Sequence, residues 1–550
     1  MREVKNKENK KNFAERLDSL IGILSPAWEL KRRLARHANE FAVKKFGLRG
    51  GYAGASKDRL RSSWLPGGGS ADEDLLPDLP DLRERSRDLV RNDGVASGIV
   101  STMTSNVVGT GITPQSNVDK ESLGIDDKTA EDFQRKVERC WERWVPHADA
   151  GNRMSFWEIQ NLIESQILQN GEVIIIPEMI DEPGRPYFRA LSLIESDRLE
   201  TPSDLRSNKS IRSGVEIGPR GEPVAYWIRK THPGDVTYTE KRISTSDNFI
   251  RYEAKNKFGQ WNVWHRYWIK RPGQTRGVPF FAPVINKFKD LAEYMEAELV
   301  AQRVAACFSL FIKKTNPYDA AIGRADSTSG TKRLEEMEPG MVEYLAPGED
   351  ITSFNPQRPG AQFDPFVEKV LRFLGTGLGL PYELVFKDFS KTNYSSARAA
   401  ILEARKFFKQ EQMWLSEKIC QPTWEMILDE AYLRGDFEAK DYFKQREHWT
   451  RARWIAPGWG YVDPEKEINA SISAIDNNLS SLADECAAHG RDYEEIMQQR
   501  AREEKMRKSL GLEKAQPKAK VPVGAGAGKE SDPVLIPDDP NNPDNQPSPD

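Results

Sequence analysis

The chain has 550 residues, 38% of them hydrophobic and 30% charged, so it is too long for one compact core and too apolar to be disordered throughout. Its 80 Lys and Arg residues against 84 Asp and Glu give a net charge of −4. Proteins that bind nucleic acid tightly over a broad face carry a basic excess, because affinity for phosphate comes largely from counterion release. The charge balance argues against that class.

The cysteines and the apolar runs argue against metal binding and membrane insertion. No two cysteines form a C-x-x-C pair, and the 6 histidines do not cluster near them, so we expect no structural metal site and reduced thiols. The N-terminus lacks the apolar segment of a signal peptide, and the longest apolar run, 304–312, is far shorter than a membrane span. We therefore expect no membrane contact and synthesis in the cytoplasm. The cysteines are Cys140, Cys307, Cys420 and Cys486.

The N-terminal region is basic and helical in pattern. Residues 1–61 hold sixteen Lys or Arg against seven Asp or Glu, a surplus of 16 − 7 = 9. A solvated arm is the simpler interpretation, and a contact with DNA or an acidic protein is the alternative. Apolar spacing predicts a helix over 13–46 with a break at Pro26. A Gly-rich loop and an acidic stretch that ends at residue 81 then predict a boundary.

Helical and strand patterns alternate over the next two hundred residues. Residues 82–108 predict two helices with a turn at 92–94, and 133–144 predict a third with one apolar side. Between 171 and 269 three β-rich runs are bounded by Gly and Pro. The runs are 172–176, 223–228 and 263–269.

A turn-rich insert is bracketed by two helical segments. The helical period covers 279–312, is lost over 313–362, and returns at 364–375. This pattern predicts an excursion out from a pair of helices.

The C-terminal part is mostly helical. A long helix is expected from Ser395 or Ser396, which would cap it, to Leu433, with a bend at Pro422 and an end at Gly435. Residues 465–510 predict polar helices. The last 20 residues have six Pro and five Asp but no Lys or Arg, which predicts disorder.

Several segments resemble catalytic or nucleotide-binding motifs only superficially. Val523-Gly-Ala-Gly-Ala-Gly-Lys529 lacks the first Gly and the Ser or Thr of a phosphate-binding loop, and Gly109-Thr-Gly111 fits a tight turn better than a dinucleotide site. Adjacent Asp72-Glu-Asp74 predicts a solvated acidic linker rather than a metal site. Asp364 and Asp388 lack a third acid for a nuclease, and Ser395 lacks a partnered His. We expect no catalytic residue.

Four segments stand out in order along the chain, and together they resemble the lambda-type portal proteins of tailed bacteriophages. Each is weak alone, but their order over roughly residues 15–510 makes chance a poor explanation. The segments are Arg85-Ser-Arg-Asp-Leu-Val-Arg-Asn92 with Asn106-Val-Val-Gly-Thr-Gly-Ile112; Gln274-Thr-Arg-Gly-Val-Pro279 with Phe281-Ala-Pro-Val284; Leu380-Pro-Tyr382, Lys387-Asp-Phe-Ser390 and Asn393-Tyr-Ser-Ser-Ala-Arg398; and Trp459-Gly-Tyr-Val-Asp-Pro-Glu-Lys466.

The resemblance implies an α+β portal fold in a ring, usually of twelve copies, at one capsid vertex, through which double-stranded DNA is packaged and ejected. It implies a location in the virion. Mapped in order, it implies an N-terminal basic helical arm and linker (1–81), a β-containing wing in two parts (82–282 and 379–435), two stem helices (283–312 and 363–378) bracketing a small α/β clip (313–362), a helical crown (436–510) and a disordered tail (511–550).

The resemblance also implies a loop that projects into the channel, for which we take residues 385–396. A portal must let a polyanion pass, so scattered lysines that touch phosphate and release it suit the role better than dense clamps or base contacts. We therefore expect DNA passage without sequence specificity. The candidate DNA-facing residues are Lys387, Asp388, Lys391, Asn393 and Tyr394.

The implied partners are other copies of the chain, the large terminase subunit, a head–tail connector or adaptor, and the major capsid or scaffold protein. The resemblance implies no cofactor and no metal, since the ATP chemistry belongs to the terminase. One alternative is a packaging enzyme, terminase or nuclease, which ATP hydrolysis by the chain alone would support. Another is a head–tail adaptor or minor capsid protein, which a ring without an axial channel would favour.

Overall fold

The computed structural model describes residues 67–235, 245–307, 311–314, 349–352, 363–460 and 464–512. The chain forms two units, Met1–Pro457 and Gly458–Asp550, and each is described by itself. The helix expected over 13–46 lies outside the described residues, as do all but the first two residues of the disordered tail expected over 511–550 and most of the expected clip.

Three helices open the described chain: α3 (Ala71–Leu75), α4 (Leu79–Asn92) and α5 (Gly94–Val107). The predicted break at 92–94 is confirmed, since the Asp93 carboxylate caps α5 by accepting from the N–H groups of Val95 and Ala96 at 2.9 and 2.8 Å. The acidic stretch, in contrast, is not a linker. Ser70 starts α3 with a capping box, and Leu79 at the start of α4 is buried.

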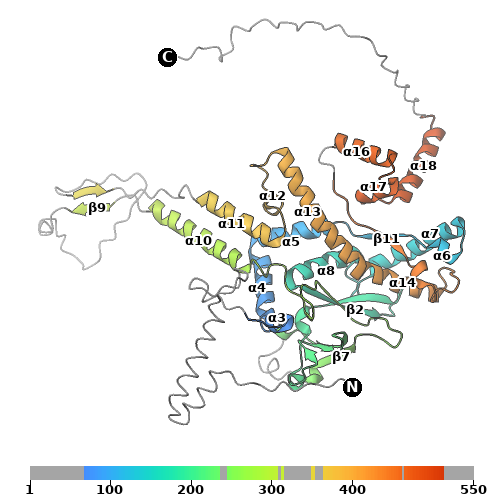
Figure 1. The fold of residues 1–550 in the computed structure, drawn as a ribbon, viewed down its shortest axis with the longest axis horizontal. Coiled ribbons are helices and arrows are strands. Elements are labelled where there is room, and N and C mark those ends of the chain that lie inside the picture. The colour runs from blue at the N-terminus through green and yellow to red at the C-terminus, as the bar shows by residue number, and fades with distance from the viewer. Residues whose placement is uncertain are drawn as a thin grey trace, which may run out of the picture. The chain divides into compact units, whose positions relative to one another are not determined.

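Two antiparallel sheets confirm the predicted β-rich region (Figure 1). One has the order β3 (Arg189–Ile194), β2 (Glu172–Met179), β8 (Trp264–Tyr267), and the other the order β4 (Ile211–Arg212), β5 (Val215–Ile217), β6 (Pro223–Arg229), β7 (Phe249–Glu253). All three β-rich runs contain strands, namely β2, β6 and β8. Side chains from both sheets share one core, which includes Ile174, Val215, Tyr226, Ile228 and Val263.

Helices α7 (Asp127–Trp144) and α8 (Phe156–Asn170) form an aromatic core together with a later helix. The apolar side predicted for 133–144 is confirmed, because Phe133, Val137, Cys140, Trp141 and Trp144 are all buried. The Trp141 ring lies 5.0 Å from the Phe156 ring and 5.6 Å from the Trp424 ring. Helix α8 is not among the predicted elements, since polar residues interrupt its buried face.

The helix–insert–helix pattern corresponds to α10 (Ile285–Cys307), β9 (Phe311–Lys314), β10 (Glu349–Thr352) and α11 (Phe363–Leu378). Figure 1 shows α10 and α11 side by side, with β9 beyond their ends. The helix predicted to reach residue 312 is shorter, because residues 311 and 312 belong to β9, which pairs with β10 antiparallel. This pairing joins the two ends of the insert.

The predicted long helix is confirmed with one interruption. It consists of α13 (Tyr394–Leu415), a π-helical turn over Ser416–Cys420, and α14 (Gln421–Arg434), which ends at Gly435 with φ 82°. Pro422 explains the interruption, because proline has no N–H and its ring clashes with the carbonyl four residues earlier. That carbonyl, of Lys418, instead accepts a hydrogen bond from Arg266 Nε at 3.1 Å.

Short elements complete the first unit. β1 (Thr113–Ser116) pairs antiparallel with β11 (Ala452–Ile455), and α12 (Tyr382–Phe386) precedes α13. The others are α6 (Lys120–Leu123), α15 (Arg446–Trp449) and 3-10 turns at Val145–His147, Ser196–Arg198, Ser203–Leu205, Pro233–Asp235 and Ser246–Asn248.

The second unit is helical over 465–510, as predicted, and contains α16 (Pro464–Asp476), α17 (Leu482–Ala488) and α18 (Tyr493–Ser509). Across the described ranges of the whole chain, no helix is long and apolar enough to span a bilayer.

Candidate functional site

The expected channel loop, 385–396, includes the end of α12, the connecting segment 387–393 and the start of α13, and the connecting segment is folded by its own hydrogen bonds. Lys387 ends α12 in the left-handed region, with φ 55°. The Asp388 carboxylate accepts hydrogen bonds from Ser390 Oγ at 2.6 Å and from Ser390 N at 3.0 Å. These two bonds lower the pKa of Asp388 below its usual value. Asp388 therefore stabilises the turn as a carboxylate.

Lys391 joins this loop to the helix pair. Its Nζ lies 2.7 Å from the Glu368 carboxylate on α11, and Arg372 lies 2.7 Å from the other oxygen of Glu368. The hydrogen bond from Lys391 and the one from Arg372 lower the pKa of Glu368. The charge of Lys391 is thus shared with a carboxylate of its own chain, which reduces its attraction for phosphate.

Asn393 begins α13. Its Oδ1 accepts a hydrogen bond from Ser396 N at 2.8 Å, so Asn393, and not Ser395 or Ser396, is the cap. The backbone of Tyr394 is the first residue of α13, whereas its side chain lies outside what the structure describes. Lys387 is exposed and forms no ion pair within the described ranges.

The adjacent helix pair exposes large apolar side chains. The Tyr294 ring on α10 packs against Phe363 and Phe366 of α11, with centroids 5.8 and 5.1 Å away, and this contact joins the two helices. Leu299 and Phe373 nevertheless remain 53% and 64% exposed. Large apolar side chains left exposed on two neighbouring helices favour a partner that covers them.

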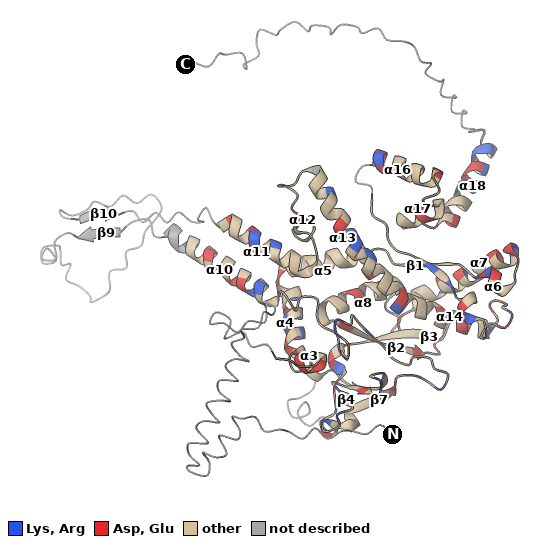
Figure 2. Cartoon of the chain, viewed as in Figure 1, with Lys and Arg blue, Asp and Glu red and all other residues tan. Residues whose placement is uncertain are grey.

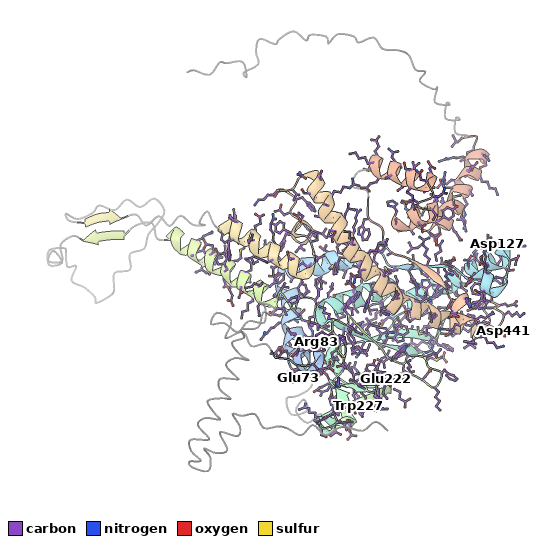
Figure 3. The ribbon with its side chains drawn as sticks, viewed as in Figure 1. Glu73, Arg83, Asp127, Glu222, Trp227 and Asp441 are labelled. Carbon is purple, nitrogen blue, oxygen red and sulfur yellow. The ribbon has the colours of Figure 1, made fainter. Side chains whose placement is uncertain are left out.

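A buried ion cluster joins α4 to both sheets. Glu172, at the start of β2, has no exposed surface and accepts from Arg83 at 2.6 Å, from Arg276 and from His265 Nε2 at 3.0 Å; Figure 3 labels Arg83. Burial alone would raise the pKa of Glu172, but the charges of Arg276 and Arg83 and the contact with His265 hold it well below 4.5. Burial lowers the pKa of Arg83 to about 10 although Glu172 opposes the change. The cluster fixes four chain segments in place.

The same cluster explains the segment 274–279. Arg276 donates to the carbonyls of Leu199 and Ser196 at 2.8 and 2.9 Å as well as to Glu172. Gly277 is required because an added Cβ would lie 2.0 Å from the carbonyl oxygen of Gly171. This segment of the family resemblance is therefore explained by a structural junction rather than by chemistry.

Asp72 belongs to the same junction, which corrects the predicted solvated acidic linker. It is only 6% exposed, and its carboxylate accepts from Thr275 N and Thr275 Oγ1, both at 2.9 Å, and pairs with Arg212 at 2.9 Å. The local run of acidic residues did not reveal this role, because the partners of Asp72 lie 140 and 203 residues away in sequence.

A second buried carboxylate lacks such partners. Glu164 on α8 has no exposed surface, and neither of its carboxylate oxygens accepts a hydrogen bond within the described structure. Burial raises the pKa of Glu164 well above 4.5, and the charge of Glu411 adds to this effect. Burial also raises the pKa of Glu411 to about 7. A hydrogen bond from Trp268 Nε1 at 3.0 Å and the charge of Lys270 act in the opposite direction but are weaker. The pair therefore holds a proton at neutral pH.

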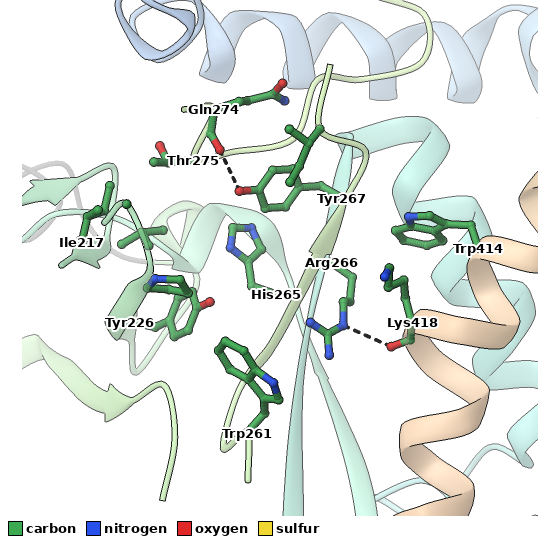
Figure 4. Close-up of a pocket in the computed structure, with 14 residues that line it drawn as sticks. Ile217, Tyr226, Trp261, His265, Arg266, Tyr267, Gln274, Thr275, Trp414 and Lys418 are labelled. Carbon is green, nitrogen blue, oxygen red and sulfur yellow. Dashed lines mark hydrogen bonds between the residues drawn. The ribbon is translucent and has the colours of Figure 1, made fainter. Parts of the chain in front are cut away.

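A small open pocket lies between the second sheet, β8 and the π-helical turn (Figure 4). Its volume is about 240 Å³, and its walls include Tyr226, Trp261 and Trp414, with Arg266 and Lys418 at one side. Its 14 lining residues include no Asp, Glu, Ser or Cys, and two of its polar side chains, His265 and Thr275, bond to Glu172 and Asp72 of the buried junction. In the described ranges no three His, Cys, Asp or Glu residues gather as a metal site would need.

The sequence analysis named none of the buried groups at Glu172, Glu164 and Glu411. One signal was present for the first, since a glutamate that opens the apolar run 172–176 must be paired if it is buried. No comparable signal exists for the carboxylate pair, because helical periodicity does not show which elements pack together.

Comparisons with known proteins agree with one another. The family model for "Phage portal protein, lambda family" matches residues 57–412. The probable portal protein of Halomonas phage phiHAP-1 is 26% identical, covering 88% of this chain and 92% of that protein. The portal protein of Escherichia phage N15 is 25% identical (84% and 90% covered), and portal protein B of Escherichia phage lambda is 25% identical (88% and 93% covered).

Among solved structures, the neck of an empty gene transfer agent particle with C6 symmetry is 14% identical with a TM-score of 0.36, covering 66% of this chain and 93% of that one. The neck of the native particle with C12 symmetry is also 14% identical with a TM-score of 0.36, covering 68% and 93%.

Proposed function

Since this chain belongs to the lambda family of phage portal proteins, we propose that its copies form a twelvefold ring at one capsid vertex, through which double-stranded DNA enters and leaves. Portal proteins are structural components of the virion that assemble into oligomeric rings. The observation that carries the proposal is the match of the family model over residues 57–412, together with relatives aligned over most of the chain.

Each part of the ring is assigned to a part of the chain. The helix pair α10 and α11 forms the stem, within 283–312 and 363–378, and the insert 313–362 forms the clip. Support comes from the β9–β10 pairing, which closes the insert at its base, and from the exposed apolar side chains of the helix pair. The wing consists of 82–282 and 379–435, and the crown of 436–510.

The loop 385–396 faces the channel and contacts DNA backbone without reading sequence. Asp388 and Asn393 shape the loop, and Lys391 ties it to α11 through Glu368. These contacts support Lys387 as the residue proposed to contact phosphate. One lysine of this loop without an ion pair in the described structure, repeated around a ring, would give a weak positive field that lets DNA slide.

Native mass spectrometry of the purified chain, with electron microscopy of the same sample, tests the ring. A closed ring near twelve copies with a hole wide enough for duplex DNA is the expected result. A ring without an axial channel, or a stable dimer that persists with capsid components added, contradicts the portal assignment and favours an adaptor.

Two changes test the assignment of the loop 385–396 to the channel. Lys387→Glu, and removal of 387–394, should leave ring assembly intact and reduce DNA packaging or retention, with Lys444→Glu on an exposed turn as the matched control. Failure of the Lys387→Glu variant to form rings would overturn the loop assignment.

Replacement of 313–362 by a short linker should abolish docking of the large terminase subunit while leaving the rest of the ring assembled. Unchanged terminase binding would remove the clip assignment. The head–tail connector and the capsid or scaffold protein are further proposed partners, with synthesis in the host cytoplasm.

A further inference from the structure

The described part of the second unit, 458–460 and 464–512, contains no buried residue at all. Helices α16, α17 and α18 each lack a buried side chain, although they carry many apolar ones. The exposed large apolar residues are Ile468, Ile472, Leu479, Leu482, Met497, Met506, Leu510 and Leu512. Because ordering a chain costs conformational entropy that apolar burial must offset, these helices need apolar cover beyond what the described residues of their own unit supply.

The helices are nevertheless well specified by local contacts. The Ser481 hydroxyl caps α17 by accepting from Asp484 N at 3.1 Å, and the Asp492 carboxylate caps α18 by accepting from Glu494 N at 2.6 Å. Gly458 lies so close to the end of α17 that an added Cβ would be 2.1 Å from the His489 carbonyl carbon. The unit therefore has defined helices and turns but lacks a covered apolar face.

The charge of this unit is unevenly distributed along its sequence, and Figure 2 shows the charged positions on its helices. Residues 464–488, which span α16 and α17, hold one basic and five acidic residues, so their net charge is 1 − 5 = −4. Residues 500–508 of α18 hold five basic and two acidic residues, a net charge of 5 − 2 = +3. Two unlike, complementary surfaces are what a copy needs in order to contact a different neighbour on each side of a closed ring.

We propose that the second unit completes its core against the second unit of the neighbouring copy, the basic half of α18 lying against α16 and α17 of the next copy. This inference rests on the proposed ring and adds that its helices are stabilised only by assembly. Ile468 and Ile472, four residues apart on one face of α16, are the apolar residues expected to be covered.

Hydrogen exchange of the full chain tests the coupling to assembly. In single chains, separated by sedimentation at low concentration, the amide hydrogens of 466–508 should exchange quickly. In rings, the same amides should exchange at least about tenfold more slowly. Amides of α7 and α14 should be protected in both samples and serve as the internal control. Equal protection of 466–508 in single chains and rings would overturn the proposal, and so would protection that appears only when duplex DNA is added.

Charge-reversal variants test whether the surface that contacts each second unit belongs to a neighbouring copy or to the same copy. Variant A carries Arg500→Glu, Arg502→Glu and Lys505→Glu, which changes the α18 segment from +3 to 3 − 6 = −3. Variant B carries Glu465→Lys, Asp476→Lys and Glu485→Lys, which changes 464–488 from −4 to −4 + 6 = +2. Each variant alone should lose the protection of 466–508 in rings, and an equimolar mixture assembled from single chains should regain it, because alternating copies then face opposite charge.

A chain that carries all six substitutions shows whether the two charged surfaces meet between copies or within one copy. If it regains protection while the mixture of A and B does not, the two surfaces meet within one copy and the proposal is wrong. If neither wild-type nor variant chains form rings with capsid components present, the portal function itself fails. Wild-type rings whose second unit stays unprotected refute only this inference.

Discussion

The buried carboxylates Glu172 and Glu164 lie on the successive elements β2 and α8, and neither exposes any surface to solvent. Glu172 accepts from two arginines, one histidine and the backbone N–H of Gly277, whereas Glu164 accepts no hydrogen bond within the described structure. Folding therefore lowers the pKa of the first and raises that of the second. The comparison teaches that burial by itself does not decide the charge of a side chain, because the donors around it do.

Loss of one hydrogen-bond partner of Glu172 should lower the stability of the chain more than any other change proposed below. Arg276→Met leaves the carboxylate buried with fewer donors, and we expect the free energy of unfolding to fall by about 3–5 kcal/mol. Urea denaturation followed by tryptophan fluorescence measures it. Arg271→Met, which breaks the exposed pair with Asp74 at 2.6 Å, is the matched control and should cost about 1 kcal/mol at most. Equal losses for both would show that the buried cluster adds nothing beyond a surface pair.

Removal of the unpartnered carboxylate of Glu164 should raise the free energy of unfolding rather than lower it. Glu164→Gln keeps the size of the side chain and removes the cost of charging it, so we expect the free energy of unfolding at pH 8 to rise by about 1–3 kcal/mol. At pH 5 the wild-type carboxyl is already protonated, so the gain should shrink. A thermal unfolding scan at both pH values checks this, and a variant less stable than wild type at pH 8 would contradict the assignment.

Glu411 should make stability depend on pH between its unfolded and folded pKa values. Its pKa rises from 4.5 to about 7 on folding, so the folded chain binds more protons in this interval and stability falls as pH increases from 4.5 to 7. Glu172, whose pKa is lowered, contributes stability that is lost as pH falls below 4.5. Glu411→Gln should reduce the slope from 4.5 to 7, since Glu164 still contributes to it, and leave the acid side of the profile unchanged. An unaltered slope would exclude Glu411 as the titrating group.

The exposed contact of the channel loop should matter least for stability. Lys391 is 66% exposed, and Lys391→Ala, which removes its pair with Glu368, should lower the unfolding temperature little, and less at high salt, because solvent and ions screen the pair. Differential scanning fluorimetry at two salt concentrations checks this. A larger, salt-independent loss would show that the pair is buried by the neighbouring copy in the ring.

The local sequence was sufficient to predict elements whose apolar residues recur with a regular period or whose ends carry a turn or cap residue. The break at Asp93, the apolar side of α7, the strands β2, β6 and β8, and the end of α14 at Gly435 all follow from periodicity or from a turn or cap residue. The five loop candidates were chosen from a resemblance, and the described contacts give roles within the loop only to Asp388, Lys391 and Asn393. Whether Lys387 or Tyr394 contacts DNA stays a prediction.

Tertiary structure decided what no local pattern encodes. Glu172 and Arg276 are 104 residues apart in sequence, and Asp72 and Thr275 are 203 apart, so which charge meets which partner depends on how α3, α4 and the sheets pack. The same holds for the π-helical turn, since proline predicts a bend at 422 but the Arg266 donor that satisfies the freed carbonyl comes from β8. The sequence by itself determined the element ends that a turn or cap residue marks, such as Asp93 and Gly435, because those signals act over one or two turns. The pairing of buried charges required the folded chain, because only packing removes water from them.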